Sequence, residues 1–405
     1  MAGGIVSQVS KSGSSDVSPA KPSLWYNPEI RGYVAQAVVA IVLAYLFYEA
    51  FHNARDNMLA HHMPTNFNFW NNIAGFDISQ TLIYFNASTS TFGRAFFVGL
   101  LNTLLVAGLG IVFATILGFI VGIARLSSNW VVAKLALVYV ELFRNVPLLL
   151  QLLFWYNAVL RPLPSPRQSL ALPGGAFLNN RGLILPNPIF SANAIWLWLA
   201  LALGIAVAYF YRRFARRRQA VTGEPGQVLL VSIAALVGFP VLGYFILGEP
   251  MHLTFPVLRG FNFVGGLQVY PEFISLLLGL TIYTATFIAE IVRGGITAVS
   301  KGQREAASAL GFSHSQSLRL IVVPQAMRVI IPPLTNQFLN LTKNSTLAVA
   351  IAYPELAQVF MGTVLNQTGA AVQIVFVTMG VYLAISLITA MIMNVYNKRV
   401  ALAER

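Results

Sequence analysis

The charged side chains that could do chemistry lie inside or beside long apolar segments. Glu141 and Arg144 stand three residues apart, as do Glu290 and Arg293, so each pair falls on one face of a helix. Lys343 occupies a third apolar segment that also carries several amide and hydroxyl side chains. Ionisable groups in such segments are usually paired, or they mark a route for a substrate. We interpret Glu290 and Arg293 as a structural pair within one helix.

The polar residues of two of these segments are candidates for a substrate path. They are Arg144, Asn145, Gln151, Asn336, Asn340, Lys343 and Ser345. Pro147 removes a backbone donor and predicts a kink that exposes carbonyl groups to a cavity. Lys343 would attract a carboxylate or hold two subunits in register. Polar spans also serve as packing contacts between helices, and both interpretations stay open.

Composition places the chain among membrane proteins. Of its 405 residues, 57% are hydrophobic and 10% are charged, against roughly 25% charged in soluble domains. The net charge of +13 comes mostly from residues that flank apolar segments, which disfavours nucleic-acid binding. The absence of cysteine excludes disulfides and thiolate metal sites, and the histidines at 52, 61 and 62 lack convincing ligand spacing. We therefore expect no metal site and no catalytic residue.

Eight apolar segments meet or approach the length of a membrane span. They are Tyr33–Tyr48, Ala95–Ile123, Val131–Leu160, Ala194–Tyr211, Val228–Leu247, Phe273–Val292, Ile330–Ala352 and Ala371–Tyr396. With both termini inside, most of the 26 basic residues fall on the inner side, including the Arg212–Arg218 cluster. The small residues of Gly118-x-x-x-Gly122 predict close packing against another helix.

A polar loop between the sixth and seventh segments carries the most specific pattern. Glu305-Ala306-Ala307 is followed by Gly311 and then by Ile321-x-Val323-Pro324. Ala and Glu favour a short helix, and Gly can end it with a positive φ. Ser313 would cap a second helix, and Pro324 marks where that helix bends or restarts. The loop is therefore predicted to lie across the inner membrane face and to dock against a protein outside the membrane.

This spaced pattern resembles the signature of permease subunits of bacterial ABC importers. Its flanking residues resemble the polar amino-acid branch: Glu290-x-x-Arg293-Gly294-Gly295, Pro324-Gln325-Ala326-x-Arg328 and Glu141-x-x-Arg144-Asn145-x-Pro147. The extended N-terminus and the segment 161–270 make the chain similar to the larger Q-type permeases of general L-amino acid transporters and their glutamate/glutamine/aspartate/asparagine relatives.

The resemblance implies an all-α membrane protein with the type I ABC importer fold. It implies a coupling helix that docks on a separate ATPase, formed by Gln303, Glu305, Ala306, Ala307, Leu310 and Gly311. Structural roles fall to Pro147, Glu290, Arg293, Gly294, Gly295, Pro324, Pro332 and Pro333. The implied partners are a second permease, two ATPase subunits, a periplasmic binding protein and an L-amino acid. The chain has no Gly-x4-Gly-Lys-Ser/Thr loop, so ATP and Mg²⁺ are expected in the partner ATPase.

The expected organisation alternates core and inserted parts. It comprises a cytoplasmic tail 1–32, a first span 33–50, a periplasmic loop 51–94, a core part 95–160, an insertion 161–270 with two extra peripheral spans, a second core part 271–397 with the coupling loop 293–330, and a cytoplasmic tail 398–405. Two alternatives remain. One is an ABC permease for another small solute such as an opine, and the other is a secondary transporter or channel that works without ATP.

Overall fold

The computed structural model describes residues 28–400, except residues 62, 65, 192, 193, 225, 247, 249 and 250. The chain divides into two compact units, one ending at Asn66 and one beginning at Phe67, and each is described by itself. Most of the expected N-terminal tail, and residues 401–405 of the C-terminal tail, lie outside the described residues.

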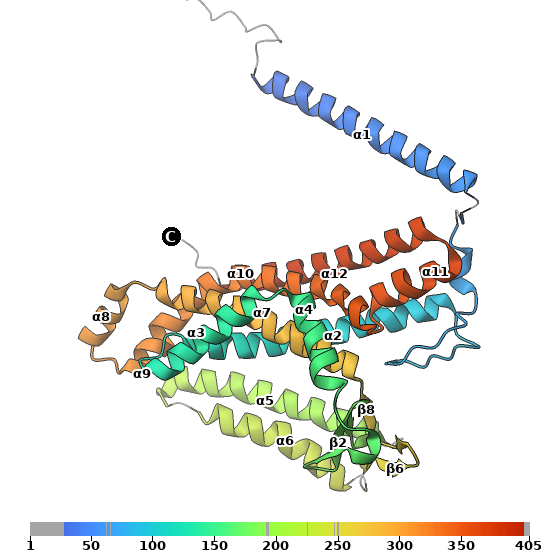
Figure 1. Cartoon of the computed structure of the whole chain (residues 1–405). Helices are drawn as coiled ribbons and strands as arrows, with labels where there is room; N and C mark the ends of the chain where they lie inside the picture. The colour runs from blue at the N-terminus through green and yellow to red at the C-terminus, as the bar shows by residue number, and fades with distance from the viewer. Residues whose placement is uncertain are drawn as a thin grey trace, which may run out of the picture. The chain divides into compact units, whose positions relative to one another are not determined.

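The first unit contains one long helix, α1 (Pro28–Ala60) (Figure 1). At about 1.5 Å per residue it extends about 50 Å, longer than the roughly 30 Å hydrocarbon core of a bilayer. The helix continues beyond residue 50, where the apolar run ends, because the next ten residues mix polar and apolar side chains and include neither Pro nor Gly. Hydropathy therefore locates the span and underestimates the length of the helix.

The second unit consists mainly of helices, most of them long. They are α2 (Phe92–Ala124), α3 (Trp130–Asn145), α4 (Leu148–Leu153), α5 (Ala194–Thr222), α6 (Val228–Ile246), α7 (Pro271–Thr297), α10 (Val323–Asn344) and α12 (Ala371–Val400). Across the described residues of both units, seven helices are long and apolar enough to cross a membrane, or up to eight if a bent pair counts as one span. The prediction of about eight spans is confirmed.

Shorter helical elements connect the spans. They are η2 (Asn68–Asn71), η3 (Phe154–Leu160), η4 (Pro166–Gln168), α8 (Lys301–Ala309), α9 (His314–Ser317), η5 (Leu318–Val322), η6 (Ser345–Ile351), η7 (Gln358–Val364) and α11 (Leu365–Thr368). η3, η5 and η7 are π-helical. The π-helical η5 directly precedes α10, whose second residue is Pro324, so α9, η5 and α10 follow one another as a long helical run despite that proline.

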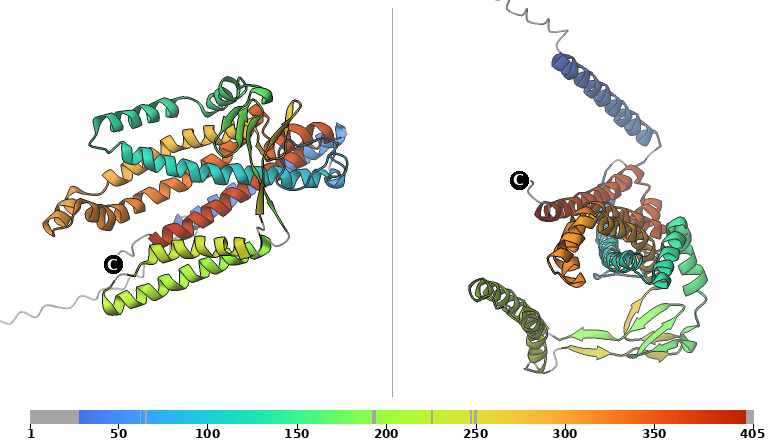
Figure 2. Two further views of the ribbon diagram at one scale, coloured as in Figure 1. Left: turned by 90° about the horizontal axis from the view of Figure 1, so that it is seen from below. Right: turned by 90° about the vertical axis from the view of Figure 1, so that its left-hand side faces the viewer.

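The packing of α2 against α7 forms the centre of the second unit. A Cβ atom on Gly118 would lie 2.6 Å from the Cβ of Ile288, and one on Gly122 would lie 2.7 Å from the carbonyl oxygen of Ala289. The close helix approach predicted from these glycines is therefore present. α10 packs on α7 and also contacts α12, so the two predicted core parts form one bundle (Figure 2).

The helical pair α3 and α4 breaks sharply at the predicted kink. The two axes differ by 102° across Val146 and Pro147. In a continuous helix, residue 147 would donate to the carbonyl of Phe143, but proline has no N–H. The side chain of Gln151 takes that place, donating from Nε2 to the carbonyl oxygens of Phe143 at 2.8 Å and Val146 at 2.9 Å.

All the strands among the described residues lie within the predicted insertion. They are β1 (Leu170–Leu172), β2 (Ala176–Asn179), β3 (Gly182–Leu185), β4 (Asn187–Phe190), β5 (Met251–Thr254), β6 (Val257–Arg259), β7 (Asn262–Val264) and β8 (Leu267–Val269). One antiparallel sheet has the order β1-β2-β3-β8, and β4-β5 and β6-β7 form two separate pairs. Pairing of β3 with β8 joins the loops that precede α5 and follow α6, so α5 and α6 extend from the bundle as an inserted hairpin (Figures 1 and 2).

Candidate functional site

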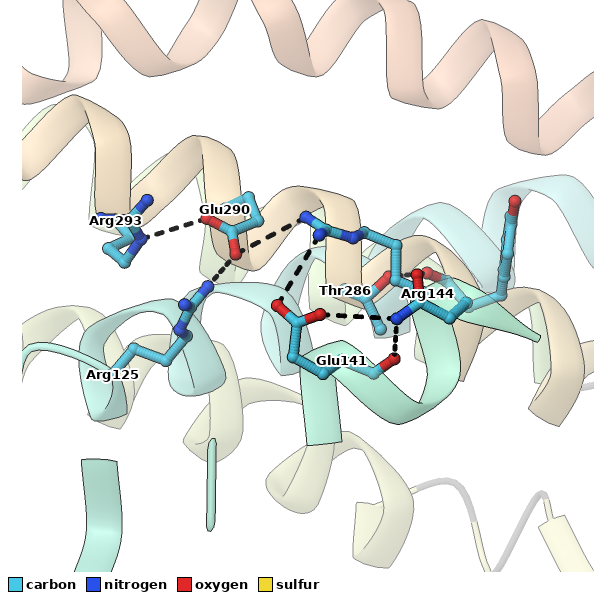
Figure 3. A network of polar contacts seen from close by, with 8 residues as sticks. Arg125, Glu141, Arg144, Thr286, Glu290 and Arg293 are labelled. Atoms are coloured by element: carbon cyan, nitrogen blue, oxygen red, sulfur yellow. Dashed lines mark hydrogen bonds and ion pairs between the residues drawn. The ribbon is translucent and has the colours of Figure 1, made fainter. Parts of the chain in front are cut away.

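A cluster of charged residues joins α2, α3 and α7 (Figure 3). Its centre is Glu290 on α7, whose carboxylate bonds Arg125 at the end of α2 and accepts from Nε of Arg293 at 3.1 Å. Arg144 of α3 approaches the same carboxylate at 3.8 Å and Glu141 at 3.6 Å. Two carboxylates and three guanidinium groups thus hold three helices together. Pairing of this kind is what makes ionisable groups tolerable near a membrane interior.

The sequence indicated the two pairs of this cluster but not their union. The interpretation of Glu290 and Arg293 as a pair within one helix agrees with the ion pair in α7. Arg125 was missed as a partner, although it directly follows a span whose small residues predict contact with another helix. Arg144 is part of this cluster, and Asn145 donates to the backbone carbonyl of Glu141 at 2.7 Å.

Three of the predicted path residues form an exposed polar stripe on α10. Asn336, Asn340 and Lys343 are spaced four and three residues apart, which places them on one helix face. All three are exposed, and none pairs with another polar group among the described residues. The fourth candidate on this segment, Ser345, is fully buried and donates to the carbonyl oxygen of Thr342 at 2.7 Å. An unpartnered polar stripe on a span must face water, substrate or another subunit.

The polar stripe ends at a cavity of about 670 Å³ between α10, η7 and α12. Its surface is mainly apolar, and its lining residues are Lys343, Thr346, Val349, Ala357, Met361, Gly362, Thr378, Met379, Tyr382, Leu383 and Ser386. The hydroxyl groups of Thr378 and Ser386 have no hydrogen-bond partner among the described residues. The cavity therefore offers one ammonium group and two unsatisfied hydroxyls within an apolar wall, at a volume typical of small-molecule sites.

A buried acidic loop supports one wall of this cavity. Glu355 is fully buried between the spans of α10 and α12. Its carboxylate accepts from the backbone N–H of Gln358 at 2.7 Å, from the hydroxyl of Thr103 at 3.4 Å and from the hydroxyl of Tyr382. Burial raises the pKa of this carboxyl, and these hydrogen bonds oppose the rise. The sequence gives no signal for Glu355, because the short Tyr-Pro-Glu turn follows an apolar run and has no recognisable spacing.

The predicted coupling residues form a short helix with two distinct faces. Ala307 is buried, whereas Glu305, Ala306 and Leu310 are exposed. Gln303 accepts from the side chain of Gln325 at 3.3 Å, which links α8 to the start of α10. α8 is thus anchored on one side and open on the other, as a docking helix must be.

Gly311 ends this helix through a left-handed turn. Its φ is +77°, and the N–H of Phe312 donates to the carbonyl of Ala307 at 3.1 Å. Ser313 then begins α9 with a reciprocal capping box, in which its hydroxyl accepts from the N–H of Gln316. These contacts fix the angle between α8 and the helix that leads into the membrane.

Comparison with known proteins decides the family. Residues 224–402 match the family of binding-protein-dependent transport system inner membrane components. The chain is 49% identical to the general L-amino acid transport system permease AapQ of Rhizobium johnstonii, covering 95% of each chain. The chain belongs to the permease family of amino-acid ABC transporters.

Two further relatives cover nearly the whole chain. The amino-acid ABC transporter permease YhdX of Escherichia coli is 46% identical, with 96% of this chain and 99% of the relative covered. The glutamate/glutamine/aspartate/asparagine transport system permease BztB of Rhodobacter capsulatus is 41% identical, with 94% and 96% covered. In this permease family, the region matched by the family model includes α8, the polar stripe of α10 and the cavity. The chain is accordingly a multi-pass protein of the inner membrane and a transport component.

Proposed function

We propose that this permease forms half of the transmembrane pore of an ATP-driven importer of L-amino acids. The observation that carries the proposal is the unpartnered polar stripe of Asn336, Asn340 and Lys343, which leads into the cavity beside α12. Such a stripe lets a polar solute approach along a span without losing all its hydrogen bonds. The family and the relatives named above support amino acids as the solute.

The cavity has the chemistry expected for a free amino acid. Lys343 would attract the α-carboxylate of the substrate. The hydroxyl groups of Thr378 and Ser386 would form hydrogen bonds, as donors or acceptors, with the amino and carboxylate groups of the substrate. The apolar wall presents no polar group that would recognise one particular side chain of the substrate. This combination favours a permease of broad amino-acid specificity over one for a single substrate.

The proposed energy source is a partner ATPase that binds ATP and Mg²⁺. The exposed side of α8 presents Glu305 and Leu310 to that partner, and Leu310 is 75% exposed. Because Ala307 and Gln303 tie α8 to the rest of the protein, movement of the docked ATPase would be transmitted to α7 and α10. The pore would then switch between inward-facing and outward-facing states by rocking of packed helices.

The remaining proposed partners are a second permease, a second ATPase subunit and a periplasmic binding protein. The second permease would cover the polar stripe and close the path from the other side. Both termini would be cytoplasmic. The binding protein would deliver the amino acid at the opposite membrane face, where the sheets of the insertion lie in this topology.

The experiment is uptake of labelled amino acids by the complete transporter in proteoliposomes. We expect uptake only when ATP and Mg²⁺ reach the ATPase side. Lys343→Met should reduce uptake at low substrate concentration by about tenfold or more, since a hydrogen bond to a charged group contributes about 1.5–3 kcal/mol. Lys343→Arg should retain most uptake, and Lys134→Met, a control on the exposed surface of α3, should be unchanged.

Three results would contradict parts of this proposal. Normal uptake by the Lys343→Met transporter would remove Lys343 from the substrate path. Uptake that persists without ATP would favour the secondary-transporter alternative. Competition by an opine but not by amino acids would instead point to the other solute class.

A further inference from the structure

The cytoplasm-proximal end of α5 carries five arginines within seven residues. They are Arg212, Arg213, Arg216, Arg217 and Arg218. Every one is exposed. Neither the substrate path nor the docking surface of α8 uses this cluster, although it is the densest group of positive charge in the chain.

Four of the five arginines share one face of the helix. Successive residues of an α-helix are rotated by about 100°, so Arg212, Arg213, Arg216 and Arg217 fall within an arc of about 140°. We call these four residues the arginine arc. Arg218 lies outside the arc and pairs with Glu224 at 3.3 Å. Glu224 therefore compensates the charge of Arg218 and not the charges of the four arginines of the arc.

The arginine arc has no acidic partner among the residues that the structure describes. Like charges at such spacing repel one another and destabilise a helix. The rule that places positive charge on the cytoplasmic side requires basic residues near a span, but it does not require them to share a face or to remain unpaired. The arrangement therefore indicates an anion that is supplied from outside the chain.

The surroundings of the arc indicate the source of that anion. α5 packs on α6 through small residues, and a Cβ on Gly204 would lie 2.6 Å from the carbonyl oxygen of Ala235. Ala215, which lies between Arg213 and Arg216 in the sequence, is buried on the side of α5 that faces α6. The arc itself continues the outward face of α5, where Ile205, Tyr209 and Phe210 are exposed. An apolar face of a span that ends in aromatic and then basic residues faces lipid first and its headgroups next.

We infer that the arginine arc is a binding site for the headgroups of anionic phospholipids in the cytoplasmic leaflet. Arginine suits this ligand because its guanidinium group forms paired hydrogen bonds with phosphate oxygens. The site would fix the depth and rotation of the α5–α6 hairpin in the bilayer. An acidic protein surface is the less favoured occupant, because the exposed residues directly above the arc are apolar.

The test measures which lipid lies next to the arc in the complete transporter. The chain has no cysteine, so Tyr209→Cys introduces one reporter site. Residue 209 precedes Arg212 by about one turn and lies about 60° around the helix from it, within the angular range of the arc, so a label there lies beside the lipid next to the arc. The transporter is placed in nanodiscs with partner subunits that carry no reactive cysteine, so that bimane labels only this position. Quenching of the bimane by brominated lipid then reports contact between the lipid and the arc. We expect brominated phosphatidylglycerol to be preferred over brominated phosphatidylcholine at least roughly fivefold, with the preference weakening as salt increases.

Matched variants separate the arc from general positive charge. Replacing the four arc residues with Gln should reduce the preference to about onefold, because the headgroup has lost its partners. Replacing the same four with Lys keeps the charge but loses the paired hydrogen bonds, so it should retain only part of the preference. The control Arg218→Gln with Glu224→Gln alters the same turn outside the arc and should leave the preference unchanged. If the variant with Gln at all four arc positions keeps the full preference, the inference is wrong.

Two other outcomes would also overturn it. If brominated phosphatidylglycerol shows no preference, while the natural chain but not the Gln variant binds inorganic phosphate, the arc binds free phosphate and not a headgroup. If the Gln variant loses the ATPase subunits from the purified transporter, the arc is a protein-docking surface. A preference for phosphatidylglycerol in the natural chain, lost in a Gln variant that still holds its ATPase subunits, supports the lipid site and does not depend on which solute the transporter carries.

Discussion

Glu355 is a buried carboxyl group whose protonation is linked to stability. Burial raises its pKa above the ordinary value of 4.5. Between 4.5 and the raised pKa the folded protein holds a proton that the unfolded chain has released, so stability falls as pH rises through that window. The slope is at most about 1.4 kcal/mol per pH unit. Glu355→Gln should therefore gain thermal stability relative to the natural chain as pH rises from 4.5, and the difference should level off above the raised pKa.

The measurement is the unfolding temperature of both proteins in detergent at a fixed heating rate. Gln suits the site because its amide oxygen can accept from the backbone N–H of Gln358, while the hydroxyls of Thr103 and Tyr382 can rotate to accept from its NH₂ group. Other titrating groups cancel in the difference between the two proteins. A difference that stays flat across the pH range would show that burial does not raise this pKa.

Single residues also show what sequence spacing can and cannot predict. The pair Glu290 and Arg293 is visible because three residues separate its members on one helix. Arg125 lies 165 residues from Glu290, and only the close packing of α2 on α7 brings it to the same carboxylate. Gln151 was a path candidate because it is polar and lies in a span. Its contact with the carbonyl that Pro147 leaves free depends on the sharp break of the chain there.

At the scale of an element, α8 should respond in opposite ways to the same substitution at two glycines. Gly311 has a φ of +77°, so Gly311→Ala should destabilise the end of the helix by about 1 kcal/mol. Gly302 lies within α8, has open space around it and needs no left-handed φ, so Gly302→Ala should be neutral or slightly stabilising. Hydrogen exchange of the α8 amides should become faster in the first variant only.

The same two variants test whether the geometry of α8 matters for coupling. We expect Gly311→Ala to lower the amount of amino acid imported per ATP hydrolysed, because the turn sets the angle between α8 and α9. Gly302→Ala should import normally. Equal coupling in both variants, with the exchange difference present, would mean that the ATPase does not depend on this turn.

The helices were easier to predict than the strands because the bilayer imposes a length and a composition on each span. The apolar runs that become α2, α7 and α12 are unmistakable. The strands have three or four residues each and stand in Gly- and Pro-rich loops, where local sequence gives a weak signal. The pairing of β3 with β8 joins segments separated by α5 and α6, and no local pattern encodes it.

At the scale of the whole second unit, the insertion leaves the permease core intact. Because β3 and β8 pair, the chain leaves the bundle after η3 and returns to it at α7 from the same place. α5 and α6 bury small residues mainly against each other, which leaves their large apolar side chains for lipid. A pair of spans can therefore be added without altering the contacts of α2, α7 and α10.

The topology of the whole molecule can be tested by counting crossings between two single cysteines. Five candidate spans separate Ser88 from Ser315 if the bent pair α3–α4 crosses the membrane, and four separate them if it re-enters on the same side. Five crossings place the two residues on opposite faces, and four place them on one face. Both serines are exposed, and Ser315 is preferable to Ser313, whose hydroxyl caps α9. The positive-inside pattern predicts that a membrane-impermeant maleimide labels Ser315→Cys only from the cytoplasm and Ser88→Cys only from the periplasm. Labelling of both from one face would show that the α3–α4 break forms a re-entrant hairpin, and the positions of α5, α6 and the arginine arc would then be reversed with respect to α2.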